Sequence, residues 1–196
     1  MSVVLVDAGG TNIGSVRYAL QRLGVDAALT ADAATIRRAD KVILPGVGAA
    51  GPGMARLREL ELVELMRSLT QPVLGVCLGM QLLCERSEEG DTPCLGLIPA
   101  QVRRFAEADG LRVPHMGWNR VQPRREHPLL RGLGAGDWAY FVHSYAVPVG
   151  DYTLAATEYG GDFSAVVARG NFHGMQFHPE RSAATGATLL KNFLEL

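Results

Sequence analysis

The chain has 196 residues, of which 47% are hydrophobic and 20% charged, and its formal net charge is -1. This size suits one domain, 1–196, with a full core. The near-zero charge gives no reason to expect a nucleic-acid or anionic-membrane partner. The start of the chain lacks the basic residues of a signal peptide, and no apolar run approaches a membrane span, so we expect a cytoplasmic protein without membrane contact.

The first half of the chain is predicted to alternate strands and helices. Apolar runs and helical periodicity predict strands at Val3–Val6, Val25–Leu29, Lys41–Leu44 and Val73–Val76, with helices from Asn12 or Ser15 to Leu23, near Ala33–Arg38 and over Met54–Ser68. This alternation predicts an α/β fold with right-handed crossovers and a mostly parallel sheet flanked by helices. Functional loops should gather where the parallel strands end.

The alternation of predicted strands and helices ends at about Glu88. Short strands, some in hairpins, are predicted near Leu95–Phe105, Leu111–Val113, Arg120–Gln122, Trp138–Val142, Thr153–Thr157, Ala165–Ala168 and Phe172–Phe177. The polar stretch Arg86–Pro93 is predicted to be a loop, and Ala183–Leu196 an amphipathic helix. We therefore expect antiparallel strands to be added to the parallel sheet in the second half.

The stretch Pro72–Gln81 contains a Gly-x-Cys-x-Gly pattern between an apolar strand and a helix that begins at Leu78. This is the cysteine version of the strand–turn–helix elbow that presents a nucleophile. A side chain in place of the glycine two residues before or after Cys77 would crowd the sharp turn. The helix N-terminus would favour a thiolate there. The alternative is an inert buried cysteine, since free cysteines are often buried.

The three cysteines are Cys77, Cys84 and Cys94, without a CxxC spacing. An odd count without that spacing argues against a disulfide framework or a zinc cluster. A reactive thiol therefore requires a reducing compartment. Cys84 falls on the same helical stripe as Cys77 and Gln81, another turn beyond Gln81, and we interpret it as an inert core thiol.

A His-Pro-Glu sequence, His178 to Glu180, ends the last predicted strand. A cysteine nucleophile needs a base, and the base needs a third group that fixes its tautomer and orientation. His178 and Glu180 fit those two roles. The alternatives are a surface turn with a salt-bridged glutamate, or a metal site that adds His173. The metal site is disfavoured because no HExxH spacing or cysteine cluster supports it.

Together these motifs resemble the class I, triad-type glutamine amidotransferases, and the resemblance runs from Val3 to the C-terminus. Within that family the chain is most similar to the glutaminase subunits of imidazole glycerol phosphate synthase, an enzyme of histidine biosynthesis. The segments Leu44–Ala49, Val113–Asn119 and Tyr140–Tyr145 carry this finer resemblance. It implies a flavodoxin-like amidotransferase fold, L-glutamine as substrate, and neither a cofactor nor a metal.

The resemblance also implies roles for individual residues. Cys77 would be the nucleophile, and His178 with Glu180 would complete the catalytic triad. The backbone N–H groups of Leu78 and Val47 would form the oxyanion hole. The expected glutamine-binding residues are Gly46, Gly48, Gln81, Ser144 and Tyr145.

A cyclase subunit with a (β/α)8 barrel is the partner that the resemblance implies, in a heterodimer that receives the ammonia. The residues expected at that interface are Asn12, Pro114, Trp118, Tyr140 and Arg181. The family usually has an aromatic residue after Asp7 and a lysine at the position of Arg181, so this chain departs from the pattern in both places.

Two other functions stay open from the sequence. The chain could be the glutaminase of another pathway, such as anthranilate, aminodeoxychorismate or pyridoxal phosphate synthesis. Alternatively, it could be a non-catalytic flavodoxin-like binding module with a redox-sensing cysteine. The pairing of His178 with Glu180 counts against the second function.

Overall fold

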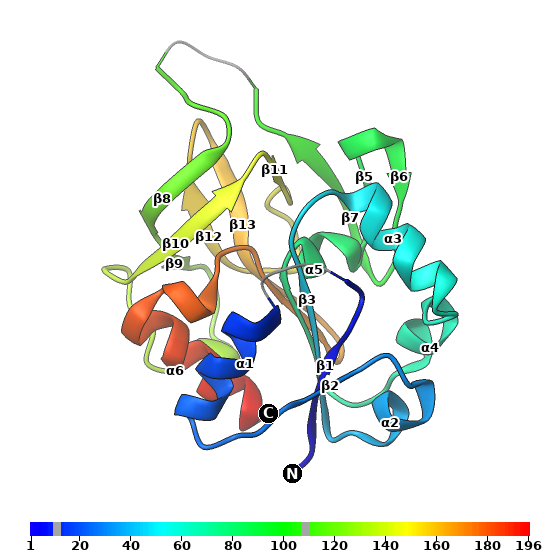
Figure 1. The fold of residues 1–196 in the computed structure, drawn as a ribbon. Helices are drawn as coiled ribbons and strands as arrows, with labels where there is room; N and C mark the ends of the chain where they lie inside the picture. Colours follow the sequence, from blue (N-terminus) through cyan, green and yellow to red (C-terminus); the bar gives the residue numbers. More distant parts are fainter. Residues whose placement is uncertain (10–12, 107–109) are drawn as a thin grey trace.

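The computed structural model describes residues 1–9, 13–106 and 110–196 (Figure 1). Its strands are β1 (Val3–Val6), β2 (Ala28–Thr30), β3 (Lys41–Gly46), β4 (Val73–Cys77), β5 (Cys84–Ser87), β6 (Thr92–Pro93), β7 (Ile98–Arg104), β8 (His115–Arg120), β9 (Gln122–Pro123), β10 (Trp138–His143), β11 (Tyr145–Ala146), β12 (Thr153–Glu158), β13 (Asp162–Arg169) and β14 (Phe172–Met175). Its helices are α1 (Ile13–Arg22), α2 (Ala33–Arg38), α3 (Ala50–Glu59), α4 (Val63–Ser68), α5 (Leu78–Leu82) and α6 (Ala183–Leu194), with 3-10 turns at Glu89–Asp91, Pro128–Leu130 and Pro179–Arg181.

The central sheet of the described residues has eight strands in the order β2-β1-β3-β4-β14-β13-β12-β9. The five strands from β2 to β14 are parallel, and β13, β12 and β9 extend the sheet in antiparallel fashion. This arrangement confirms the predicted α/β fold with a mostly parallel sheet and added antiparallel strands.

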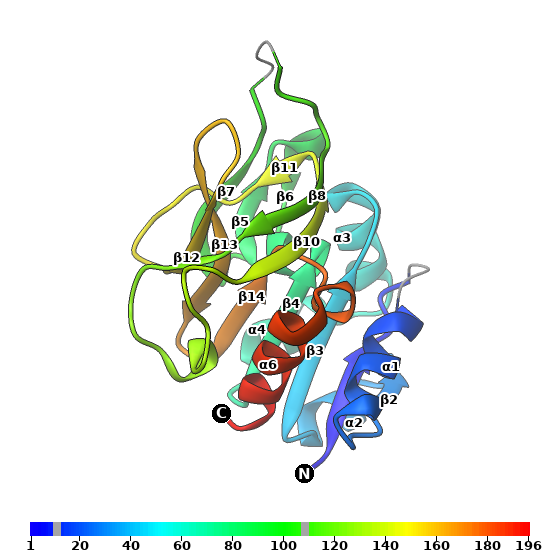
Figure 2. The same ribbon diagram turned by 90° about the vertical axis from the view of Figure 1, so that its left-hand side faces the viewer.

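Helices cover both faces of the sheet. In Figures 1 and 2, α1 and α6 lie on one face, and α2, α3 and α4 on the other. Alternation along β1 explains the two layers, because Leu5 packs with α1 and α6 while Val4 and Val6 pack with α2, α3 and α4. Strands buried on both faces read as continuous apolar runs, which is why β1, β3 and β4 were recognisable from sequence. The edge strand β2 is largely exposed, and it begins three residues later than the strand predicted at Val25–Leu29.

Two smaller sheets stand over the carboxyl end of the parallel strands (Figure 1). One pairs β10 with β8, and the other has the order β11-β7-β5-β6. Their position leaves the ends of β3, β4 and β14 facing a wall made by the second half of the chain. None of the helices in the described ranges has the length and apolar character that a membrane crossing requires.

Several predicted elements differ from the structure. The helix predicted over Met54–Ser68 is two helices, because Glu61 takes a positive φ of 55° and Leu62 turns inward to full burial. The N–H of Leu62 still bonds the carbonyl of Leu57, at 2.9 Å. Packing of Leu62 into the core therefore interrupts the helix that the local hydrophobic periodicity predicted as continuous.

The other differences lie after the elbow. The helix predicted to include Cys84 ends at Leu82, and Cys84 opens β5. Arg86–Pro93, predicted to be a loop, contains the end of β5, a 3-10 turn and β6. Leu111–Val113 forms no strand, and the strand predicted over Arg120–Gln122 is instead β8 with the short β9. Polar residues are frequent in these short strands, so their sequence carries little strand signal.

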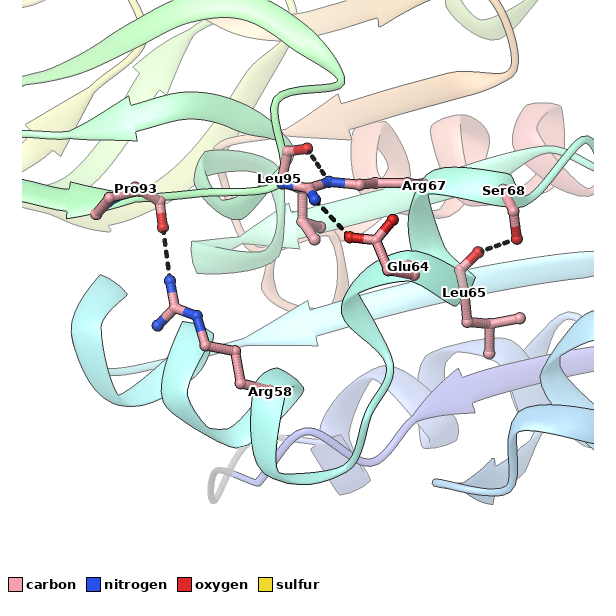
Figure 3. Close-up of polar contacts among 7 residues, drawn as sticks. All are labelled: Arg58, Glu64, Leu65, Arg67, Ser68, Pro93 and Leu95. Carbon is pink, nitrogen blue, oxygen red and sulfur yellow. Dashed lines mark hydrogen bonds and ion pairs between the residues drawn. The ribbon is translucent and has the colours of Figure 1, made fainter.

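Two arginines attach the chain after β6 to the helical layer (Figure 3). Arg58 of α3 donates to the carbonyl of Pro93 at 3.2 Å, and Nε of Arg67 in α4 donates to the carbonyl of Leu95 at 2.9 Å. Arg67 also pairs with Glu64 at 2.6 Å. These bonds fix the route by which the chain leaves the elbow region and enters the second half.

Candidate active site

Cys77 lies at the joint of β4 and α5 in a strained backbone conformation, with φ 54° and ψ -112°. Positive φ is uncommon for a residue with a side chain and is frequent at functional turns. A Cβ on Gly75 would lie 2.6 Å from the backbone of Gly79, and one on Gly79 would lie 1.8 Å from the carbonyl oxygen of Leu44. The prediction that both glycines are required by crowding is confirmed.

The sheet register brings the end of the chain to this elbow. Gly46 of β3 pairs with Cys77, and on the other side Met175 of β14 pairs with Val76. Carboxyl ends of neighbouring parallel strands meet at one edge, so Val47 and His178 both arrive beside the thiol.

His178 joins Cys77 to Glu180. Its Nδ1 lies 2.9 Å from Oε1 of Glu180, its ring also hydrogen-bonds Cys77, and both the imidazole and the carboxylate are almost fully buried. Burial lowers the pKa of His178, but the hydrogen bonds and charges of Cys77 and Glu180 outweigh it and raise that pKa to about 10. The imidazole is therefore held in its protonated form at neutral pH.

Backbone contacts hold the histidine in place. The N–H of His178 donates to the carbonyl of Tyr140 at 2.9 Å, and Oγ of Ser182 donates to the carbonyl of His178 at 2.6 Å. The segment that carries the base is thus tied to β10 on one side and to the start of α6 on the other.

A pocket of about 320 Å³ opens at the thiol. This volume is within the range of small-molecule sites. Its lining brings together most of the residues predicted from sequence: Val47, Gly48, Cys77, Leu78, Gln81, Pro114, Ser144, Tyr145 and His178. Gly46 lies behind this lining, where a Cβ would be 2.9 Å from the backbone N of Gly79. Glu180 reaches the pocket only through His178.

Gln81 ties the elbow helix to the opposite wall. Its Nε2 lies 2.9 Å from both the carbonyl of Tyr145 and Oε1 of Gln176. Nε2 of Gln176 in turn lies 3.9 Å from Sγ of Cys77. Sequence reasoning missed Gln176, although it precedes His178 by two residues. It is fully buried, and its amide can orient the thiol.

Glu89 is a pocket residue that sequence reasoning missed, since it fell in a stretch expected to be a loop. Its Oε2 accepts a hydrogen bond from the N–H of Ala50, at 2.7 Å, where α3 begins. This bond fixes the carboxylate at the rim of the pocket. An acidic group at that place suits the ammonium group of a free amino acid.

The other two cysteines are remote from this chemistry. Burial raises the pKa of both the Cys84 and the Cys94 thiol, the latter to about 11. Such thiols stay protonated and unreactive at neutral pH. Among the residues that the structure describes, no group of three or more histidine, cysteine or acidic side chains is arranged to hold a metal ion.

Three of the residues expected at a partner interface form a cluster: Trp118 on β8, Tyr140 on β10 and Arg181 in the 3-10 turn Pro179–Arg181. Pro114 lines the pocket instead. The Trp118 ring meets Tyr140 edge-on at 5.9 Å, and the guanidinium of Arg181 lies 4.7 Å above the Tyr140 ring. Trp118 is 50% exposed and its neighbour Met116 is 63% exposed. Asn12 lies outside the described residues.

Comparison with known proteins places this geometry in a family. The model of the class-I glutamine amidotransferases matches residues 4–196. The chain belongs to the class-I glutamine amidotransferase family. It is therefore an enzyme of the glutamine-hydrolysing class, and the cysteine and histidine of the pocket are of the types that this chemistry requires.

Individual relatives give a finer similarity. The chain is 60% identical to the imidazole glycerol phosphate synthase subunit HisH of Xanthomonas euvesicatoria pv. vesicatoria, over 99% of this chain and 97% of that protein. It is 58% identical, with the same coverage, to the subunit HisH of Xylella fastidiosa strain Temecula1. A solved structure described as a glutamine amidotransferase shares the fold, with a TM-score of 0.77, 22% identity, and 100% and 98% of the two chains covered.

Proposed function

We propose that this chain is the glutaminase subunit of an imidazole glycerol phosphate synthase, and that it hydrolyses L-glutamine and delivers the ammonia to a cyclase subunit. The observation that carries the proposal is the buried row of Cys77, His178 and Glu180 at the end of a pocket of amino-acid size. The similarity to HisH subunits over almost the whole chain favours this pathway over the other amidotransferases considered from sequence.

The proposed reaction starts with Cys77 as a thiolate and His178 as an imidazolium. The sulfur attacks the side-chain amide carbon of glutamine, and the N–H groups of Val47 and Leu78 stabilise the oxyanion. The C–N bond breaks as His178 gives its proton to the departing nitrogen. Water then attacks the glutamyl thioester while His178 takes its proton, and the C–S bond breaks to release glutamate.

The same proposal assigns the binding of the amino-acid end of glutamine. Ser144, Tyr145 and Glu89 line the same pocket as the thiol. We expect the Ser144–Tyr145 backbone, with Gln81 and Gly48, to grip the substrate, while the free oxygen of Glu89 receives the α-ammonium group. A carboxylate on that rim favours a free amino acid over a peptide, whose nitrogen carries no charge.

The cyclase is expected to dock on the cluster of Met116, Trp118, Tyr140 and Arg181. Exposed aromatic, methionine and arginine side chains are the types enriched at protein interfaces. Ammonia is largely protonated in neutral water, which gives a physical reason for direct delivery. We also propose that 1–196 act as one domain, and that the protein works in the cytoplasm, where its thiol stays reduced.

Replacing the nucleophile tests the proposal. Cys77→Ala in the complex should abolish glutamine-dependent synthesis but leave synthesis from added ammonium salt intact, because cyclisation takes place on the partner. Cys84→Ala and Cys94→Ala are the matched controls and should retain glutaminase turnover. If Cys77→Ala still hydrolyses glutamine, the proposed nucleophile is wrong.

A further inference from the structure

A chain of hydrogen bonds runs from strand β8 to the wall of the glutamine pocket. Nδ2 of Asn119 lies 3.3 Å from Nε2 of His115, and Nδ1 of His115 lies 3.1 Å from Nε2 of His143. Nδ1 of His143 lies 2.7 Å from the carbonyl oxygen of Tyr145. We call Asn119, His115 and His143 the histidine relay. The triad does not use it.

The direction of every bond in the relay follows from its two ends. The carbonyl of Tyr145 can only accept, so His143 carries its proton on Nδ1 and presents a bare Nε2. His115 must then donate from Nδ1 and accept at Nε2. The amide of Asn119 is oriented to donate, because its Nδ2 also bonds the carbonyl of Glu158 at 2.9 Å and its Oδ1 accepts from the N–H of Arg120 at 2.8 Å. Both ends thus agree on one arrangement.

The environment of the relay keeps both imidazoles neutral. His115 is 3% exposed and stacks on Tyr159 at 3.9 Å and on Phe141 at 5.0 Å, while His143 is 7% exposed beside Phe105 and Phe163. Burial lowers the pKa of His115 to about 4 and that of His143 to about 3. A second proton on either ring would set two N–H groups against each other, or an N–H against the Asn119 donor.

The relay ends on an atom that the pocket depends on. The Tyr145 carbonyl accepts from both Nδ1 of His143 and Nε2 of Gln81, so it is held from β10 and from the elbow helix at once. Ser144 and Tyr145 border the pocket, and Ser144 sits between the two relay-supported residues His143 and Tyr145. Few conformations of this segment satisfy both bonds.

We propose that the histidine relay is a positioning device that holds the Ser144–Tyr145 segment in the geometry that receives glutamine. This inference rests on the proposed function. Its members act through the Tyr145 carbonyl and take no part in proton transfer to the substrate.

His115→Phe in the full chain, assayed with the cyclase present, is the decisive variant. Phenylalanine keeps the stacking on Tyr159 and Phe141 but removes both relay hydrogen bonds of the ring. Loss of these two bonds loosens the support of the Tyr145 carbonyl, so we expect the KM for glutamine to rise about tenfold while kcat falls less than about threefold. His173→Phe is the matched control, since His173 is 4% exposed on β14 and makes ring contacts with His127 and Phe193 rather than with the relay.

A second variant is made at Asn119, which is only half-buried, so its substitution is less disruptive to folding than that of His115. Within the relay, Asn119→Ala removes only the first bond, together with the side-chain bonds to Glu158 and Arg120 outside it. It should raise the KM by a smaller factor than His115→Phe, with no change in kcat. An unchanged KM in both relay variants, or an equal rise in His173→Phe, would overturn the positioning role. Thermal unfolding of the three variants separates a loss of stability from a loss of binding.

Direct binding separates this inference from the proposed function. Glutamine is titrated into the full chain carrying Cys77→Ser and followed by saturation-transfer NMR, with and without His115→Phe. Weaker binding with the second substitution supports the relay, and equal binding refutes it. If the chain with Cys77→Ser alone binds no glutamine and the wild-type complex hydrolyses none, the proposed function fails and the positioning role falls with it.

Discussion

The two walls of the pocket each contain a buried histidine, and the two histidines are in opposite states. His178 and His143 are both 7% exposed. The pKa of His178 is raised to about 10, whereas that of His143 is lowered to about 3. Burial by itself lowers the pKa of both rings, so burial cannot explain the difference.

Their partners explain it. His178 lies between a carboxylate and a thiol, two groups that become anions, so a protonated ring gains two charge-assisted bonds. His143 lies between a carbonyl and a second neutral imidazole, which together accept one proton and supply another. The side of the pocket with Cys77 and His178, which we call the charged wall, is thus suited to proton transfer. The side with His143, Ser144 and Tyr145, which we call the neutral wall, is suited to holding a fixed geometry.

The largest expected effect tests the charged wall. His178→Asn removes the group that we propose to protonate the leaving nitrogen and activate water, and general acid–base catalysis typically contributes about 10²–10⁴-fold. We expect glutaminase turnover near background in this variant. Glu180→Gln should lose less, because it weakens the orientation and charge of His178 without removing the ring. An equal, small loss in both variants would indicate another base, and the proposed difference between the two walls would be wrong.

The next effect concerns the loop after β3, which faces the charged wall. A Cβ on Gly48 would meet nothing within 4 Å and its φ is 94°, whereas Gly46 is packed against Gly79. Peptide rotation is therefore easy at Val47–Gly48 and hindered just before it. Val47→Pro removes the N–H that we propose as one oxyanion donor, and such a loss costs roughly 10²–10³-fold in kcat. The KM for glutamine should change less.

The same rotation offers a switch for the partner. We expect low glutaminase activity from the chain alone, and a rise of about the same factor when the cyclase and its nucleotide ligand are bound. Steady-state assays of the chain alone, with the cyclase, and with cyclase plus ligand measure this. Equal rates in all three would refute gating by Val47–Gly48.

A smaller effect tests whether the carboxylate of Glu89 contributes to glutamine binding. Glu89→Gln keeps the bond from the N–H of Ala50 but removes the charge that would hold the α-ammonium group. A hydrogen bond to a charged group is worth about 1.5–3 kcal/mol, so the KM should rise at least about tenfold with little change in kcat. Glu88→Gln, next to it, is the control and should leave the KM unchanged. A fall in kcat at constant KM would contradict the binding role.

Sequence patterns captured the charged wall better than the neutral one. Two short contiguous motifs carry this wall: Cys77 with its glycines, and His178 with Glu180. Their chemistry could be predicted from the residue types and their spacing. The strands that carry them are buried apolar runs, so the edge where they meet followed from the parallel sheet. That is why the separation of about a hundred residues between them did not hide the site.

The neutral wall depends on contacts that no local pattern records. His115 and His143 stand opposite each other only because β8 and β10 pair in one particular register. Glu89 reaches the rim because a 3-10 turn replaces the expected loop, and Gln176 meets the thiol because β14 lies beside β4. The pairing and register of these strands and turns are set by tertiary packing, so these residues became visible only in three dimensions.

The smallest effect, on stability, tests the difference in charge state itself. Burial lowers the folded-state pKa of His115, His143 and His173, so the unfolded chain takes up their protons first as the pH falls below about 6.5. The free energy of unfolding should therefore decrease between about pH 6.5 and pH 5, by at most about 1.4 kcal/mol per pH unit for each histidine. The raised pKa of His178 has the opposite sign: its contribution is complete below about pH 6.5 and is lost as the pH rises through about 10. Urea unfolding across this range should show a shallower acid slope in His115→Phe and in His173→Phe, but an unchanged acid slope in His178→Asn. If the dependence of the unfolding free energy on acidic pH is the same in both phenylalanine variants as in the wild type, the fold does not hold the buried rings neutral.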